Sequence, residues 1–487
     1  MIATISPKNT LLTEDLHVLN IGLKGFSAPI LQHNGNVLDL EWIPTFIDIT
    51  VKNNANLSWT LATLIGDTTI DAANKIAFER YLAAQPVLVG IGLAKDTLPN
   101  MQGDLANGKI ILHAGPPILW KDMCGPQQGA IIGAILYEGW ANTHEDAQKL
   151  VENGEITLDP CHHHAAVGPM AGIISPNMPV WIVKNTTAGN ISYSNMNEGL
   201  GKVLRFGANS SDVITRLNWM RDVLAPTLTK VLATLGTLDL KPIMAQALHM
   251  GDEVHNRNMA ASSLLFKKIT SAALRTDNID HKNLADVLEF IANNDHFFLN
   301  LSMAACKSML DAAAGVENSS MVTAMARNGV QFGIQISAFP ERWFVAPAPF
   351  VEGLFFSGYS QDDAARDLGD SAITETAGVG GFSMAAAPAI VQFVGGTPQD
   401  AIANTLKMFH ITLGKNNAFT LPALAFGGAP AGIDVRKVVD TSIAPIINTG
   451  IAHKQAGIGQ VGAGITFAPL ACFTLALAAL GEISGDK

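Results

Sequence analysis

Apolar and polar positions along the chain alternate in a way that predicts strands and helices in turn. Near the N-terminus two short apolar runs, 17–22 and 36–42, flank a glycine turn and a helical stretch over 26–32. That order is typical of a Rossmann-like strand–helix–strand unit. The next apolar runs are helical over 56–82 and strand-like over 86–93 and 109–113. We therefore expect a Rossmann-like α/β domain over residues 1–115.

Beyond this domain the periodicity changes twice. Mixed helix and strand patterns over 116–207 predict a second α/β domain, which includes a glycine-rich helix over 125–141. From 208 to 330 the pattern is that of amphipathic helices, and Ser211 is suited to cap the first of them. Residues 331–487 alternate glycine-rich loops, apolar runs and helices. We expect this part to form a C-terminal α+β domain, within a chain of α/β class that also contains a largely helical domain.

One apolar stretch, 456–481, contains no charged residue and is long enough to cross a bilayer. It is rich in glycine and alanine and includes Gln460 and Pro469. A buried helix behind a glycine-rich loop therefore fits it better than a membrane anchor. The motif GxGxxG at 457–462 has too few residues after it for a βαβ unit, so we interpret it as packing.

Composition narrows the classes of function. Charged residues make up 15% of the chain, against roughly 25% in an average globular protein, so we expect surface to be buried in a homo-oligomer or a larger assembly. The net charge of −11, from 31 basic and 42 acidic residues, argues against a nucleic-acid partner. The four cysteines are widely spaced, and residues 1–10 lack the pattern of a signal peptide. These features predict a reduced, cytoplasmic protein without a disulfide framework.

The densest polar motif is the decapeptide 249–258, which concentrates seven polar or ionisable side chains in an otherwise apolar chain. On a helix, His249, Glu253 and Arg257 would share one face. An ordinary solvated helix face is one interpretation, and a hydrogen-bonded network or a functional site is the one we favour. The candidate residues are Asp252, Glu253, His255, Asn256, Arg257 and Asn258.

A second set of polar residues combines Arg327 with the segment 367–376. Glycines over 378–381 follow, and then an apolar helix is expected from Ser383. A glycine turn that enters a helix presents free N–H groups suited to an anion, although a plain helix-entry turn is the alternative. The candidate residues of the second segment are Asp370, Thr374, Glu375 and Thr376.

Histidines supply a third set. His113 opens a loop after a strand-like run, which is where α/β proteins place ligands. His162, His163 and His164 are adjacent, and on a strand at most two of them could point to the same side. We expect polar contacts, acid–base work or a structural role from this run, and no bound metal.

Four longer motifs resemble the YlbE/YahG-like proteins, a bacterial family long regarded as of unknown function. They are His113–Ile118, Met250–Asn258, Phe344–Pro347 and Gly369–Thr376, within a resemblance that extends from about residue 15 to 480. One branch of the family is AllG, a subunit of an oxamate carbamoyltransferase that works with FdrA-type subunits. The resemblance implies transfer of a carbamoyl group between carbamoyl phosphate and a small amide or acid such as oxamate, in purine- or allantoin-type nitrogen catabolism.

Such a transfer needs two anions held in line and donors for the charge that develops on the carbonyl oxygen. Arginine binds phosphate and carboxylate through a bidentate fork, so Arg257 and Arg327 are our first candidates for the anions, followed by Lys202 and Arg205. The candidates for proton transfer or carbonyl polarisation are His113, His163 and His255. The candidates that would orient these groups are Asp252, Glu253 and Glu375.

The expected partners are an FdrA-like subunit and a further small subunit, and no cofactor is expected. Two alternatives stay open. In the first alternative, the chain is a non-catalytic scaffold and its FdrA-like partner carries out the chemistry. In the second, the chain is a Rossmann-type dinucleotide-binding enzyme that uses the segment Gly22–Glu41.

Overall fold

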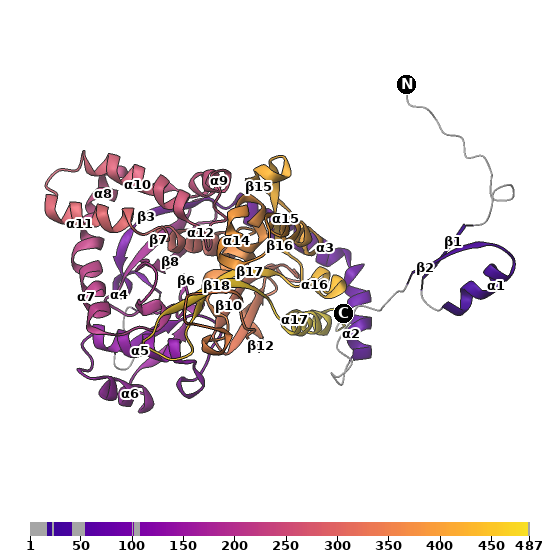
Figure 1. Ribbon diagram of the computed structural model, residues 1–487, viewed down its shortest axis with the longest axis horizontal. Coiled ribbons are helices and arrows are strands. Elements are labelled where there is room, and N and C mark those ends of the chain that lie inside the picture. The colour runs from indigo at the N-terminus through magenta and orange to yellow at the C-terminus, as the bar shows by residue number, and fades with distance from the viewer. Residues whose placement is uncertain (1–16, 22–23, 41–53, 100, 102–107, 486–487) are drawn as a thin grey trace, which may run out of the picture. The chain divides into compact units, whose positions relative to one another are not determined.

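The computed structural model describes residues 17–21, 24–40, 54–99, 101 and 108–485 (Figure 1). The chain separates into two compact units, Met1–Ser58 and Trp59–Lys487. The domain boundaries expected at 115, 207 and 330 therefore concern subdivisions of the second unit and stay predictions.

In the first unit, β1 (His17–Ile21) and β2 (Asn36–Leu40) form a parallel pair in which His17 lies opposite Asn36. The helix α1 (Ser27–Gln32) connects them, so the predicted strand–helix–strand order is confirmed. A Rossmann-like domain over 1–115 is not confirmed, because the next strands along the chain join other sheets in the second unit. Gly22 and Glu41 of the proposed dinucleotide segment lie outside the described residues.

Several separate sheets build the second unit. The largest has the order β6–β8–β7–β3–β9, and the central pair β3–β7 is antiparallel. Its strands are β3 (Pro86–Leu93), β6 (Ala166–Val167), β7 (Pro179–Asn185), β8 (Ile191–Asn195) and β9 (Leu238–Asp239). A short parallel pair joins β4 (Ile110–His113) to β5 (Thr157–Pro160).

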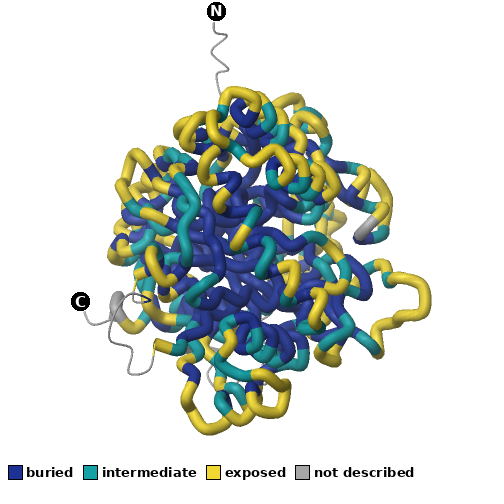
Figure 2. Tube along the Cα trace, turned by 90° about the vertical axis from the view of Figure 1, so that its left-hand side faces the viewer, coloured by how far each residue is buried: buried dark blue, intermediate teal, exposed yellow. Residues whose placement is uncertain are grey.

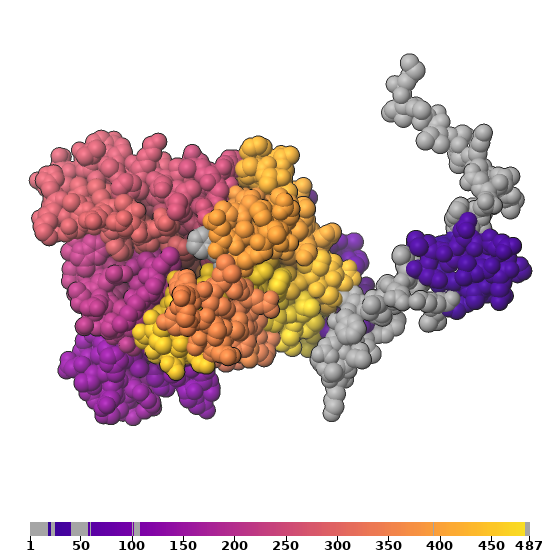
Figure 3. All heavy atoms as spheres, viewed as in Figure 1, coloured from indigo at the N-terminus to yellow at the C-terminus, as the bar shows by residue number. Residues whose placement is uncertain are grey.

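The C-terminal half contributes three antiparallel sheets. One has the order β12–β11–β10–β14, another the order β13–β18–β17, and the third pairs β15 with β16. Their strands are β10 (Val322–Asn328), β11 (Gln331–Ile336), β12 (Phe339–Pro347), β13 (Glu352–Phe355), β14 (Leu368–Gly369), β15 (Thr412–Leu421), β16 (Gly427–Ile433), β17 (Ile446–Ala452) and β18 (Gln460–Phe467). The pairing of β13 with β18 brings the segments near 350 and 460 side by side, as the surface in Figure 3 also shows.

Helices cover these sheets, and the chain is of mixed α/β class as predicted. The described helices up to residue 152 are α2 (Asn54–Ile65), α3 (Thr68–Ala83), α4 (Ala94–Thr97), α5 (Gly125–Tyr137) and α6 (His144–Glu152). The middle of the chain is helical as expected up to residue 311, with α7 (Ser211–Trp219), α8 (Ala225–Leu235), α9 (Lys241–His249), α10 (Met259–Ala273), α11 (His281–Ala292) and α12 (Leu299–Asp311). The end of the range expected to be helical, 322–328, is instead the strand β10. The remaining helices are α13 (Ile373–Thr376), α14 (Val391–Val394), α15 (Pro398–Met408), α16 (Val435–Thr441) and α17 (Leu470–Gly485).

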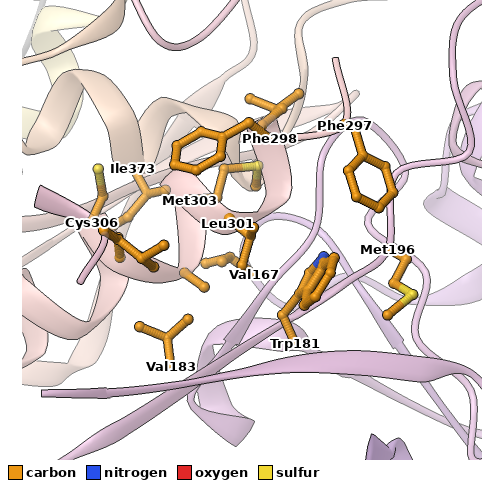
Figure 4. Close-up of a cluster of buried hydrophobic side chains, with 14 of the residues drawn as sticks. Val167, Trp181, Val183, Met196, Phe297, Phe298, Leu301, Met303, Cys306 and Ile373 are labelled. Carbon is orange, nitrogen blue, oxygen red and sulfur yellow. The ribbon is translucent and has the colours of Figure 1, made fainter. Parts of the chain in front are cut away.

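The helix α12 is the centre of the core. Almost every one of its residues is buried, and it packs against β3, β7 and β8 as well as β10 and α13. Figure 4 shows part of this cluster, where Leu301 and Met303 meet Trp181 and Ile373, and Figure 2 shows the buried trace that it belongs to. Because α12 is buried on all sides and contacts both the five-stranded sheet and the strand β10, it holds that sheet against the C-terminal half.

Two expectations for the C-terminal part need correction. The apolar helix expected from Ser383 is a run of 3₁₀ turns over Gly380–Ala386 that is kinked at Ser383. The glycine-rich segment before α17 is not a loop but the strand β18, because it pairs on one side with β17 and on the other with β13. None of the helices in the described ranges combines the length and the apolar character that crossing a membrane requires.

Candidate functional site

The decapeptide 249–258 forms a loop instead of the expected helix. The helix α9 ends at His249 and α10 begins at Met259. Between them Gly251 and Val254 have φ values of 96° and 69°, which a right-handed helix excludes. The prediction that His249, Glu253 and Arg257 share one helix face is therefore wrong. The side chains of this segment are held by other contacts.

The contacts of this loop hold its acids and amides in place. Glu253 Oε1 accepts the N–H of Arg257 at 2.7 Å, and the side-chain amide of Asn258 donates to the carbonyl of His255 at 2.5 Å. Asp252 Oδ2 accepts the N–H of Ala261 at 2.9 Å, close to the start of α10. The loop held in this way carries His255, whose side chain contacts the segment 370–381.

His255 and Glu375 form the central pair of the candidate site. His255 Nδ1 lies 2.8 Å from Glu375 Oε1, and both side chains are buried. Glu375 Oε1 also accepts the N–H groups of Gly381 at 2.8 Å and Asn448 at 3.2 Å. The glycine turn predicted to bind an anion is thus occupied by the protein's own carboxylate. Gly380 permits this approach, since a Cβ there would stand 2.2 Å from Glu375 Oε1.

A small cavity of about 20 Å³ opens beside this pair. Its polar walls are Arg205, His255, Asn256, His296, Ser371 and Gln460. Three buried atoms on these walls have no hydrogen-bond partner within the described part of the chain: Asn256 Nδ2, His296 Nδ1 and Gln460 Oε1. Buried polar groups in native proteins are nearly always paired, so three such atoms around one cavity indicate a place for a polar ligand or water.

Arg205 supplies the positive charge of the cavity. Its Nε and Nη2 both donate to the carbonyl of Gly199, at 3.2 and 2.7 Å, and its guanidinium lies 4.9 Å from the ring centre of Phe206. Burial lowers the pKa of Arg205 to about 10, in spite of the nearby Glu198 carboxylate. The side chain therefore stays charged at neutral pH and is directed to a single carbonyl oxygen.

The titratable groups around the cavity are shifted mainly by burial. The pKa of Glu253 rises to about 7 and that of Asp252 to about 6, because both carboxyls are desolvated. Burial, with the charges of Arg205 and His255, lowers the pKa of His296 to about 3, so its imidazole is neutral. Such shifts cluster at functional sites, although buried networks also produce them.

Arg327, expected to bind an anion, is fully engaged within the protein. Its Nε and Nη2 bind the two oxygens of Asp367 at 2.7 and 2.9 Å, and Nη1 donates to the carbonyl of Gly369 at 2.7 Å. Nη2 also reaches Thr449 Oγ1 at 3.1 Å. The guanidinium thus ties β10 to β14 and β17, and anion binding by Arg327 stays a prediction.

Asp370 lies next to Ser371 of the cavity wall and is fully buried. Its two oxygens accept the N–H groups of Gly115 at 2.8 Å and Gly168 at 3.0 Å, and His162 Nε2 is 3.7 Å away. Burial raises the pKa of Asp370 to about 7. Asp370 therefore joins three chain segments behind the cavity.

The other expected histidines do not line the cavity. His113 is buried beside the carbonyl of Ala114, and burial lowers its pKa to about 4. His163 and His164 both bind Asp159, at 3.0 and 2.8 Å, from a 3₁₀ turn and not from a strand. In the described ranges, no group of three or more His, Cys, Asp or Glu side chains is arranged to hold a metal ion.

The remaining expected residues fall into two groups. Lys202 is exposed, and Arg257 lies outside the cavity, where its Nε donates to the carbonyl of Gly251 at 3.1 Å. The hydroxyl of Thr374 donates to Glu375 Oε2 at 2.9 Å, and the hydroxyl of Thr376 donates to the carbonyl of Ala372, just before α13. The motifs 250–258 and 369–376 thus meet through His255 and Glu375, and Arg205 joins them.

Sequence reasoning missed His296, Ser371 and Gln460 as part of the site. His296 stands alone before α12, and Gln460 lies in the stretch that we interpreted as packing. The signal available for Gln460 was a polar side chain in a stretch without charges. His296 carried no signal in the sequence, because its relation to His255 exists only in three dimensions.

The fold and the site define a mixed α/β protein with a small cavity lined in part by buried polar side chains. A family model described as "Oxamate carbamoyltransferase subunit AllG" matches residues 156–371. The chain is 45% identical to the uncharacterized protein YahG of Escherichia coli K12, over 96% of this chain and 98% of that protein. It is 49% identical to the oxamate carbamoyltransferase subunit AllG of the same organism, over 86% of this chain and 99% of that protein.

A solved structure agrees with this similarity. A crystal structure of a conserved protein of unknown function from Enterococcus faecalis V583 has a TM-score of 0.82 and 49% identity, over 85% of this chain and 97% of that one. The chain therefore belongs to the family that contains YahG and AllG.

Proposed function

We propose that the chain is a subunit of a carbamoyltransferase and that the cavity between Arg205 and His255 binds its small anionic substrates. The observation that carries this proposal is that an arginine charged at neutral pH and a carboxylate-bound histidine line one small cavity. The description of the relative AllG as an oxamate carbamoyltransferase subunit supports the choice of reaction. The substrates are carbamoyl phosphate and a small amide or acid such as oxamate.

In the proposed mechanism Arg205 holds an anionic oxygen of a substrate. Its guanidinium already binds a carbonyl oxygen, that of Gly199, in the geometry that a carboxylate or phosphate oxygen would use. Exchange of one oxygen for the other moves the loop that carries Leu200, a residue that lines the cavity and is 49% exposed. This exchange provides the room that a ligand larger than water needs.

His255 then serves as the proton acceptor. Glu375 accepts a hydrogen bond from the Nδ1–H of His255, and this tautomer leaves the Nε2 of His255, a residue that lines the cavity, free to act as a base. The acceptor nitrogen attacks the carbamoyl carbon, a C–N bond forms, the C–O bond to phosphate breaks, and phosphate leaves with the electron pair. The nitrogen's proton passes to His255 Nε2.

The proposal includes partner subunits. AllG is described as a subunit, and the chain's low charge content fits burial of surface in an assembly. An FdrA-like protein and a further small subunit are the partners we propose. If the catalytic groups belong to such a partner, this chain is the scaffold of the complex.

The test is calorimetric titration of the chain, alone and with copurified subunits, with carbamoyl phosphate, oxamate and phosphate. The wild type is expected to bind at least one of them saturably, and Arg205→Met is expected to weaken that binding 30-fold or more. Arg205→Lys keeps the charge and controls for folding, and Arg342→Met removes an exposed arginine as a matched control. Equal binding by Arg205→Met and the wild type would remove the cavity from the proposal. If Glu375→Gln keeps both substrate binding and carbamoyl transfer, the catalytic groups would be assigned to a partner subunit.

A further inference from the structure

Three unpaired polar atoms belong to residues that line the cavity, and together they have a definite chemical requirement. Asn256 Nδ2 is a donor, Gln460 Oε1 is an acceptor, and His296 Nδ1 belongs to an imidazole that is neutral because burial lowers its pKa. Each of them is buried without a hydrogen-bond partner among the described residues. A ligand that satisfies this set must therefore both accept and donate hydrogen bonds within a very small volume.

Anions meet only half of this requirement. A carboxylate or a fully ionised phosphate ester accepts from Asn256 and from Arg205, but it has no proton for Gln460 Oε1. The Nε2 of Gln460 donates to the carbonyl of Gly462 at 3.2 Å, which fixes the amide so that Oε1 is the end left for a ligand. An acceptor-only ligand would leave this buried oxygen unpaired or repel it, which costs affinity.

We propose that Asn256, His296 and Gln460 form a subsite that recognises a primary amide, –CO–NH₂, beside the anion held by Arg205. The amide carbonyl accepts from Asn256 Nδ2, and the NH₂ group donates to Gln460 Oε1. His296 Nδ1 completes the set as the second partner of the planar group.

The size of the cavity supports a small planar group. A volume of about 20 Å³ admits little more than one or two water-sized groups, so it takes the end of a ligand and not a whole metabolite. The rest of the ligand extends toward Leu200, which lines the cavity and is half exposed. Gly199 and Gly201 on either side of Leu200 have φ values of 100° and 85° and open space at their Cβ positions.

This inference rests on the proposed function for the identity of the amide, because two substrates there carry one. The carbamoyl group of carbamoyl phosphate and the amide of oxamate share the –CO–NH₂ chemistry. The subsite itself can be tested without either substrate, since simple amides should bind it in the absence of any transfer reaction.

The experiment compares ligands that differ only in the amide. Oxamate is paired with oxalate, carbamoyl phosphate with acetyl phosphate, and acetamide serves as a minimal probe, all measured by calorimetry or ligand-observed NMR on the full chain with its copurified subunits. The wild type is expected to bind the amide of at least one pair 10-fold or more tightly than its amide-free partner. The pair that shows this preference identifies which substrate uses the subsite.

The variants are Gln460→Leu and Asn256→Leu, with Gln455→Leu as a control glutamine on the connection between β17 and β18. Gln460→Leu is expected to reduce the preference for the amide to less than 3-fold and to change binding of oxalate or acetyl phosphate by less than 3-fold. Gln455→Leu should keep the preference. If Gln460→Leu loses all binding and also has an altered melting temperature, loss of the subsite and loss of the fold must be distinguished. Gln460→Glu makes this distinction, because it keeps the acceptor oxygen and is expected to retain the preference for the amide.

Two results would overturn the inference. One is a wild type that binds oxalate as well as oxamate, acetyl phosphate as well as carbamoyl phosphate, and no acetamide. The other is a preference for amides that Gln460→Leu and Asn256→Leu both leave intact. If either result is found together with transfer activity, the subsite is refuted and the proposed function is retained. If acetamide binds the wild type and not Gln460→Leu, but no transfer activity is found, the subsite is retained and the proposed function is refuted.

Discussion

The buried ion pair between Arg327 and Asp367 offers a prediction that separates a structural role from an anion-binding one. Both side chains are 0% exposed, and the guanidinium joins β10, β14 and β17. Arg327→Met removes the cation and leaves the Asp367 carboxylate buried with only one other described hydrogen bond, from the N–H of Leu368. Breaking a buried pair in this way typically costs about 3–5 kcal/mol.

The expected shift in melting temperature follows from the size of the second unit, 59–487. An unfolding entropy of about 2.1 cal/mol/K per residue gives roughly 0.9 kcal/mol/K for this unit. A loss of about 3–5 kcal/mol therefore lowers the melting temperature by about 3–6 °C. Scanning calorimetry at one fixed scan rate measures it, because a chain of this size can unfold irreversibly.

The control is the double variant Arg327→Met/Asp367→Leu, which leaves no unpaired charge and is expected to recover at least half of the loss. The exposed Arg342→Met should change the melting temperature by less than about 1 °C. An Arg327→Met protein that melts like the wild type but no longer binds carbamoyl phosphate or phosphate would refute this reasoning. Arg327 would then be an anion ligand, as first expected from the sequence.

Two further predictions concern the loop and the glycine turn around the site. Burial raises the pKa of the Glu253 carboxyl from 4.5 to about 7, so the folded state binds this proton more tightly than the unfolded chain does. The contribution of Glu253 to the free energy of unfolding is therefore full below pH 4.5 and falls as the pH rises to 7. Glu253→Gln should therefore raise the melting temperature relative to the wild type at pH 8 and not at pH 4.5, and an equal difference at both pH values would contradict the shift. Gly380→Ala places a methyl group 2.2 Å from Glu375 Oε1 at φ 60°, so it should destabilise the chain by about 2 kcal/mol or more and shift the pH dependence of any transfer reaction. Unchanged melting and an unchanged pH profile in Gly380→Ala would show that the turn is not rigid.

The sequence was sufficient for the local elements with clear periodicity. The strands β1, β2, β3 and β4 and the helices from α7 to α12 agree with the apolar patterns that predicted them. Periodicity reports which face of an element is buried, and that information is local. It failed at 250–258 and at 380–386, where glycines and a left-handed Val254 break the helix in favour of contacts with distant segments.

The candidate site could be predicted in part, because some of its signals are also local in the sequence. The polar density of 250–258 and 369–376 identified His255 and Glu375, because ionisable groups in a charge-poor chain stand out in the sequence itself. The ranking of the arginines was not accessible from the sequence. Arg257 and Arg327 lie in richer motifs, yet it is Arg205 that lines the cavity together with His255 and His296.

The amino-acid sequence by itself determined the family, the mixed α/β class and the two polar motifs, since these depend on residue types and their order along the chain. The tertiary structure alone decided that Glu375 occupies the glycine turn, that Asp367 neutralises Arg327, and that His296 and Gln460 join the cavity. Each of these depends on how the fold places buried polar groups from different elements against one another. Burial makes an unpaired group costly, so the fold selects the partners, and no local pattern records that selection.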